Sequence, residues 1–136
     1  MTRVLLDTGP LVAALDTRDS NHLACIEYLR TARDDLFTTE AVLTEAMHLL
    51  GAHEPRGLCF RFLRNLNVRF ASVSGQGLLR AEALMKQYAD LPMDYADASL
   101  VVAGEALGID TVLTLAQRDF QVYRLEGRRP FRFVLR

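Results

Sequence analysis

The sequence lacks any long apolar run. Half of the 136 residues are hydrophobic, but no stretch approaches the roughly 18 apolar residues of a membrane-spanning helix. The opening Met1-Thr2-Arg3 leads into a predicted strand, without the apolar core and cleavage site of a signal peptide. We therefore expect no membrane partner, a cytoplasmic location and a single domain over residues 1–136, which is long enough to bury a core.

Cysteine and histidine are also scarce. Cys25 and Cys59 lie in predicted helices and lack the spacing of metal ligands, so we expect reduced core residues. His22, His48 and His53 lack zinc-ligand spacing, and we expect them to be exposed on helices. The pattern argues against a disulfide framework or a zinc site.

Other phosphate chemistries lack the residues that they need. Residues 74–77 carry half of a dinucleotide-binding pattern, but Arg80 stands at the third glycine position. Gly9 stands two residues after Asp7, where aspartate-nucleophile phosphotransferases have a second aspartate. A phosphate-receiver domain needs a late lysine, and the only lysine, Lys86, lies in a predicted helix.

Nearly all of the basic charge is arginine. The sixteen basic residues include one lysine, so fifteen are arginine, and they concentrate in residues 54–70 and 118–136. If the acids described below bind cations, the remaining surface is basic despite a net charge of −1, which suits a polyanion. Arginine on solvated faces, in a codon-biased genome, is the other interpretation.

Short apolar runs alternate with helical patterns. Strands are predicted at residues 3–6, 36–38, 68–73, 111–114 and 131–135. Helices are predicted at residues 9–15, 22–33, 39–52, 56–67, 75–89 and 94–107. Strands separated by helices predict a three-layer α/β/α domain with a short, mainly parallel sheet of about five strands.

Acidic residues occur where such a sheet places its ligands. Asp7 ends the first apolar run, and the carboxyl ends of parallel strands are the usual binding edge. Glu45 lies at the edge of the apolar arc of its helix, where it either lines a cleft or extends into solvent. Asp94 and Asp97 share one face of a nearly all-apolar helix. They are either site residues or, respectively, the N-cap and a first-turn acid.

Four stretches of the chain, in order, resemble the conserved blocks of PIN-domain nucleases. They are Leu5-Leu6-Asp7-Thr8-Gly9-Pro10, Thr38-Thr39-Glu40-Ala41-Val42-Leu43-Thr44-Glu45, Asp94-Tyr95-Ala96-Asp97-Ala98-Ser99 and Val112-Leu113-Thr114-Leu115-Ala116-Gln117-Arg118-Asp119. The resemblance spans nearly the whole chain. Among such proteins, the chain is similar to VapC-type toxins of bacterial toxin–antitoxin pairs.

The resemblance implies a set of site residues. Asp7, Glu45 and Asp97 match the catalytic acids, and Asp94 joins them as a metal ligand, with Thr8 and Thr114 as supporting residues. The fourth block departs from the family pattern, because Ala116 stands where an acid is usual. If residues 116–119 form a helical turn, Asp119 presents its carboxylate to the same cleft.

The resemblance therefore implies a Mg²⁺- or Mn²⁺-dependent endoribonuclease. Its expected partners are RNA, an antitoxin whose basic or apolar segment covers the acidic cleft, and a second copy of the chain. We expect the homodimer to use the apolar side chains of Leu58, Phe60, Phe62 and Leu63. The alternatives are a PIN-like RNA- or protein-binding module weakened by Ala116, and a hydrolase of DNA.

Overall fold

The computed structural model describes residues 2–51 and 57–135. The elements in chain order are β1 (Arg3–Leu6), α1 (Thr8–Leu15), α2 (His22–Thr31), β2 (Asp35–Thr38), α3 (Glu40–Leu50), α4 (Leu58–Asn65), β3 (Arg69–Phe70), α5 (Gly75–Gln87), α6 (Tyr95–Leu107), β4 (Thr111–Leu113), α7 (Gln117–Phe120), β5 (Arg124–Leu125), β6 (Arg129–Pro130) and β7 (Arg132–Phe133).

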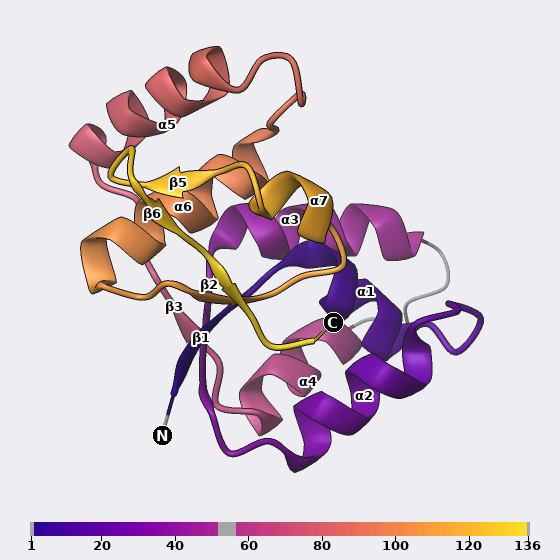
Figure 1. The fold of residues 1–136 in the computed structure, drawn as a ribbon. Helices are drawn as coiled ribbons and strands as arrows, with labels where there is room; N and C mark the ends of the chain where they lie inside the picture. The colour runs from indigo at the N-terminus through magenta and orange to yellow at the C-terminus, as the bar shows by residue number, and fades with distance from the viewer. Residues whose placement is uncertain (1, 52–56, 136) are drawn as a thin grey trace.

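The main sheet has five parallel strands in the order β3-β2-β1-β4-β7. β1 is central, and its residues Val4, Leu5 and Leu6 are fully buried, as expected of a strand covered on both faces. Figure 1 shows α2 and α4 on one side of the sheet and α5 and α6 on the other. The predicted three-layer α/β/α fold with a five-stranded sheet is confirmed.

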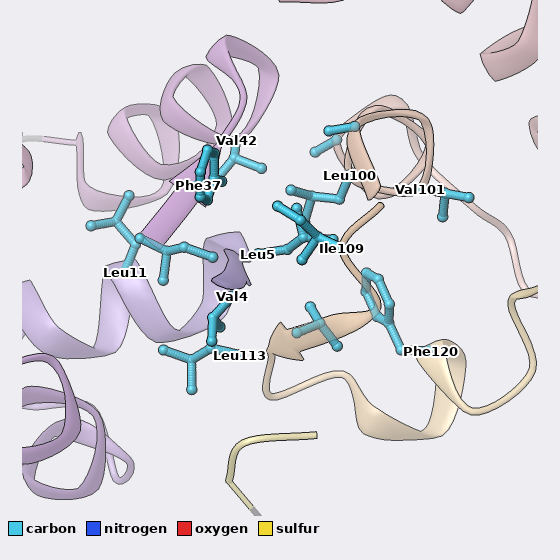
Figure 2. Packing of buried hydrophobic residues seen from close by; sticks show 14 of the residues in the cluster. Val4, Leu5, Leu11, Phe37, Val42, Leu100, Val101, Ile109, Leu113 and Phe120 are labelled. Carbon is cyan, nitrogen blue, oxygen red and sulfur yellow. The ribbon is translucent and has the colours of Figure 1, made fainter. Parts of the chain in front are cut away.

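The core lies between the sheet and these helices. Figure 2 shows Leu5 of β1 beside Leu100 of α6 and Ile109, with Phe120 of α7 closing the same region. α6 packs closely on β1 at Gly104, where an added Cβ would lie 3.1 Å from Leu5 Cδ1, and it would also lie 2.6 Å from the Ile109 carbonyl oxygen in the segment after α6. Close packing of α6 on β1 places the start of this helix, with Asp94 and Asp97, beside the end of β1.

Several element boundaries differ from the predicted ones. Helix α2 ends at Thr31, and α3 begins at Glu40 because the Thr39 side chain caps it by accepting the Val42 N–H. The predicted 56–67 helix spans Leu58–Asn65, with residue 56 outside the described residues. The outer strands β3 and β7 have two residues each, shorter than predicted, since an edge strand has only one neighbour to pair with.

An antiparallel pair of strands, β5 and β6, was not predicted. These two-residue strands carry no alternating pattern, and a turn with Glu126 and Gly127 at positive φ joins them. The hairpin packs on α6, where Glu105 accepts hydrogen bonds from Arg80 of α5 and from the Glu126 N–H. Long-range contacts therefore stabilise a segment that has weak local preference.

Cys25 and Cys59 are buried, and neither is in a disulfide, which confirms the expectation. His48 is exposed as expected, whereas His22 is half-buried with its Nδ1 2.8 Å from the Ala13 carbonyl oxygen; His53 lies outside the described residues. Within residues 2–51 and 57–135, no helix is long and apolar enough to cross a membrane.

Candidate metal and nuclease centre

Two of the predicted site residues lie at the carboxyl ends of the central strands. Asp7 follows β1, and Thr114 follows its parallel neighbour β4, so both lie at the same edge of the sheet. The Thr114 hydroxyl donates to Asp7 Oδ2 at 2.7 Å and accepts the Ala116 N–H at 2.9 Å. Asp7 is only 5% exposed, so this hydroxyl compensates part of the cost of burying a carboxyl group.

Hydroxyl contacts also bring helices α3 and α6 together at this edge. Thr39, the N-cap of α3, shares a 2.7 Å hydrogen bond with Ser99 of α6, and both side chains are buried. Glu45 lies half-buried on α3 and lines one cleft with Asp94 at the start of α6; after burial, Asp94 is among the causes that raise the pKa of Glu45. The contact between α3 and α6 therefore joins two acids that are far apart in the sequence.

Asp94 and Asp97 occupy the first turn of α6. Asp94 is the N-cap, since its Oδ1 accepts the Asp97 N–H at 2.8 Å, and it also lines a cleft with Glu45. Asp94 can therefore cap the helix and face the cleft at the same time. Asp97 is half-buried, and its Oδ2 accepts a 3.0 Å hydrogen bond from the Tyr123 hydroxyl.

Tyr123 was missed by the sequence reasoning. It is fully buried and follows α7 in a segment with no acidic motif around it, so no local signal identifies it as a neighbour of Asp97. Its ring lies 5.0 Å from those of Tyr88 and Phe120, centroid to centroid. A search for buried tyrosines could have found it, because a buried phenol hydroxyl needs a hydrogen-bond partner.

The segment after β4 forms the expected helical turn. Residues 117–120 are helix α7, with Ala116 as its N-cap, and Asp119 is half-buried. The negative charge of Asp119 raises the pKa of both Asp7 and Tyr123. Asp119 therefore lies within electrostatic reach of the acids, although Ala116 contributes no carboxylate.

Burial and the charges of neighbouring acids raise the pKa values of Asp7, Glu45 and Asp97. Burial, followed by the charges of Asp7 and Asp94, raises the pKa of Asp97 from 3.8 to about 7. Burial raises the pKa of Asp7 as well, with smaller contributions from Asp94 and Asp119, while the hydrogen bond from Thr114 lowers it. Burial also raises the pKa of Glu45, to which Asp94 and Asp7 add.

A cleft of about 870 Å³ opens beside these acids. Glu45 and Asp94 form part of its wall, with His48 and the 38% exposed ring of Tyr95. Apolar atoms from Ala71, Val73 and Leu78 complete the wall, and a volume of this size accommodates a small ligand or a segment of chain. The described lining residues include neither Asp7, which is buried, nor Asp97, which is half-buried.

The donor chemistry fits a hard divalent cation. Carboxylate oxygens are the usual ligands of Mg²⁺ and Mn²⁺. Burial and, after it, the charges of neighbouring acids raise the pKa values of Asp7, Glu45 and Asp97, and a bound cation would favour their ionised form. In the part of the chain that the structure describes, the Thr8 hydroxyl is buried without a hydrogen-bond partner. In the same part, no three acidic, histidine or cysteine side chains already stand in a metal-holding arrangement.

The sequence matches the PIN domain family over residues 4–125. Ribonuclease VapC26 from Mycobacterium tuberculosis is 25% identical over 134 residues, which are 96% of this chain and 99% of the relative. Among solved structures, Mycobacterium tuberculosis VapC20, a sarcin–ricin loop cleaving toxin, has a TM-score of 0.69 and 17% identity, covering 80% of this chain and 86% of its own.

A second solved structure, VapBC2 from Rickettsia felis bound to a DNA fragment from their promoter, has a TM-score of 0.56 and 13% identity. The match covers 83% of this chain and 87% of that chain. At these identities the two structures show a shared fold. The family match covers residues 4–125, which include every acid described above. The chain therefore belongs to the PIN-domain family.

Proposed function

We propose that this protein is a divalent-metal-dependent endoribonuclease, the toxin of a toxin–antitoxin pair. The observation that carries the proposal is the convergence of Asp7, Glu45, Asp94 and Asp97 at the carboxyl edge of a PIN fold, where burial and then the neighbouring acids raise the pKa values of Asp7, Glu45 and Asp97. The similarity to ribonuclease VapC26 supports RNA as the substrate.

Each residue has a role that follows from its position. Asp7, Glu45 and Asp97 would hold Mg²⁺ or Mn²⁺, with Asp94 as a further ligand. When bound, such a cation supplies a water of lowered pKa and neutralises charge on the phosphate. Thr114 orients the Asp7 carboxylate, and Thr8, whose buried hydroxyl has no hydrogen-bond partner among the described residues, would be a second orienting group.

A PIN-like binding module is the second candidate. It is favoured by Ala116 at a usual acid position and by the lack of a ready-made metal arrangement among the described residues. Such a module would retain RNA or a protein in the cleft without cleaving the phosphodiester. Metal-dependent cleavage is therefore the measurement that separates the two candidates.

We propose an antitoxin as the protein partner. The cleft combines the acids Glu40, Glu45 and Asp94 with an apolar wall, which is complementary to a segment carrying basic and apolar side chains. The solved VapBC2 structure supports a partner of this kind. We expect the pair to act in the cytoplasm, where RNA is available.

The test is cleavage of RNA by purified protein. We expect cleavage with Mg²⁺ or Mn²⁺ that stops when EDTA is added. Asp7→Asn and Asp97→Asn should each lower the rate at least about 100-fold, beyond the roughly 10- to 100-fold typical of losing an outer-shell partner. Circular dichroism should show that both variants remain folded.

Asp90→Asn is the matched control, because Asp90 is an exposed acid outside the cluster and its variant should cleave like the parent. Parallel assays with single-stranded DNA test the hydrolase of DNA. If Asp7→Asn cleaves RNA as fast as the parent in the presence of metal, the proposed centre is wrong. Tight RNA binding without cleavage would instead support the binding module.

A further inference from the structure

Tyr123 places its hydroxyl group on one of the proposed metal ligands. The hydroxyl donates to Asp97 Oδ2 at 3.0 Å, across 26 residues of sequence, and the Tyr123 side chain is fully buried. The phenol is a hydrogen-bond donor at neutral pH, since an ordinary tyrosine hydroxyl keeps its proton up to a pH of about 10. The contact is therefore a permanent hydrogen bond to a carboxyl group of the site.

The packing of the ring gives this hydroxyl a defined position. Tyr88 and Phe120 hold the ring through tilted and edge-on contacts at 5.0 Å, and Phe120 is itself packed on Phe131. A side chain fixed on its aromatic faces has little freedom to move its hydroxyl. By contrast, the hydroxyl of the neighbouring Tyr88 accepts a hydrogen bond from the backbone N–H of Arg124. A tyrosine in this aromatic cluster therefore does not need a carboxylate as its hydrogen-bond partner.

The geometry points to Tyr123 as a positioning residue for Asp97. By engaging Oδ2, Tyr123 fixes the rotation of the Asp97 carboxylate, which would hold the cation of the proposed nuclease. The inference rests on the proposed function and extends it to a residue that no acidic pattern identifies. Carboxylates that bind metals are commonly oriented by such outer-shell hydrogen bonds.

The same segment supports a second acid in the same way. Thr114 donates to Asp7 Oδ2 and Tyr123 donates to Asp97 Oδ2, so residues 114–123 supply one hydroxyl to each. This segment lacks the usual acid, since position 116 is alanine. This segment therefore contributes hydroxyl groups that orient Asp7 and Asp97, the carboxylates that other parts of the chain provide.

The experiment compares Tyr123→Phe with two matched variants. Tyr28→Phe removes a hydroxyl that donates to Asp34 at 2.6 Å, outside the site. Tyr88→Phe removes a hydroxyl from the same aromatic cluster that contacts no acid among the described residues. Each variant keeps its ring, so urea midpoints should shift by similar amounts for Tyr123→Phe and Tyr28→Phe.

Titration with Mn²⁺ by calorimetry is the deciding readout. We expect Tyr123→Phe to weaken Mn²⁺ binding about 10- to 100-fold, while Tyr28→Phe and Tyr88→Phe bind like the parent. The metal concentration that half-saturates cleavage should rise by the same factor, and a crystal structure of Tyr123→Phe should show a rotated Asp97 carboxylate.

Two outcomes separate this inference from the proposed function. Equal Mn²⁺ affinity of parent and Tyr123→Phe, or an equal loss in Tyr28→Phe, would overturn the positioning role while leaving the nuclease intact. Mn²⁺ binding that depends on Tyr123, in a parent that cleaves no RNA, would overturn the nuclease and support the positioning role. A parent that binds no Mn²⁺ would overturn both.

Discussion

Asp7 and Thr114, 107 residues apart in the chain, form a buried hydrogen bond of 2.7 Å at the carboxyl ends of adjacent parallel strands. The threonine hydroxyl links the two strands at their ends, because it donates to the acid after β1 and accepts the backbone N–H of Ala116 after β4. This one side chain therefore affects both stability and the orientation of the proposed ligand.

Replacing Thr114 by valine should destabilise the protein. Thr114→Val keeps the volume but leaves the buried Asp7 carboxyl group without its donor and the Ala116 N–H without its acceptor, which costs about 1–3 kcal/mol of unfolding free energy. Thr114→Ser retains the hydroxyl and should lose less. Urea unfolding measures the difference. Thr111→Val is the control, since Thr111 lies in β4 and its hydroxyl donates to Asp110 at 3.3 Å, outside the site; equal losses in the two valine variants would contradict the prediction.

The metal-free protein should lose stability as pH rises. Because burial and neighbouring acids raise the pKa of Asp97 from 3.8 to about 7, the folded state binds this proton more tightly than the unfolded state does. Stability from this group is therefore complete at low pH, decreases between about pH 4 and pH 7, and is lost above that window. The raised pKa values of Asp7 and Glu45 act in the same direction.

Unfolding in urea and EDTA over this pH range measures the effect. We expect Asp97→Asn to show a shallower decrease than the parent and to be the more stable of the two at about pH 8. Asp90→Asn should retain the slope of the parent. Adding Mn²⁺ at the higher pH should restore stability to the parent but much less to Asp97→Asn. An unchanged slope in Asp97→Asn would show that this carboxyl group does not titrate as described.

Position 116 should control the affinity for metal. We expect Ala116→Asp to tighten Mn²⁺ binding and to raise cleavage at low Mg²⁺, because affinity for a hard cation increases with the number of ligand charges. Asp119 lies close enough to raise the pKa of Asp7, so Asp119→Asn should weaken Mn²⁺ binding, on the order of tenfold. Calorimetric titration of both variants against Asp90→Asn tests this. Equal affinities in all of them would mean that the segment after β4 adds no charge to the site.

The apolar surface of α4 should support a homodimer. Phe60 is 47% exposed, and Leu58 and Phe62 are half-buried. The prediction that Leu63 belongs to this surface is wrong, because Leu63 is a core residue that is 3% exposed. We expect sedimentation to show a dimer at tens of micromolar, well above a Kd of about one micromolar, and Phe60→Asp to dissociate it.

Leu79→Asp is the matched control for the dimer, because Leu79 is exposed on a different helix, α5. A strictly monomeric parent would remove the dimer altogether. Dissociation by Leu79→Asp but not by Phe60→Asp would assign the contact to α5 instead of α4.

Much of the fold was predictable because its signals are local. The central strands β1, β2 and β4 are short apolar runs, and α6 is an apolar helix that ends at Gly108, which has the positive φ that favours glycine. The edge strands β3 and β7 were predicted with bounds that are too long, and the β5–β6 hairpin was not predicted. The extent of these strands depends on the elements beside them, since β3 pairs with β2, β7 pairs with β4, and β5 packs on α6.

The sequence by itself determined the order of the acids and the element on which each one lies. Asp7 after a buried strand and Asp94 at a helix start follow from patterns of neighbouring residues, and such patterns report backbone conformation. Only the tertiary structure decided which hydroxyl meets which carboxyl group. The Thr114–Asp7 and Tyr123–Asp97 contacts join residues 107 and 26 positions apart, and they form because close packing of the helices on the sheet brings those side chains together.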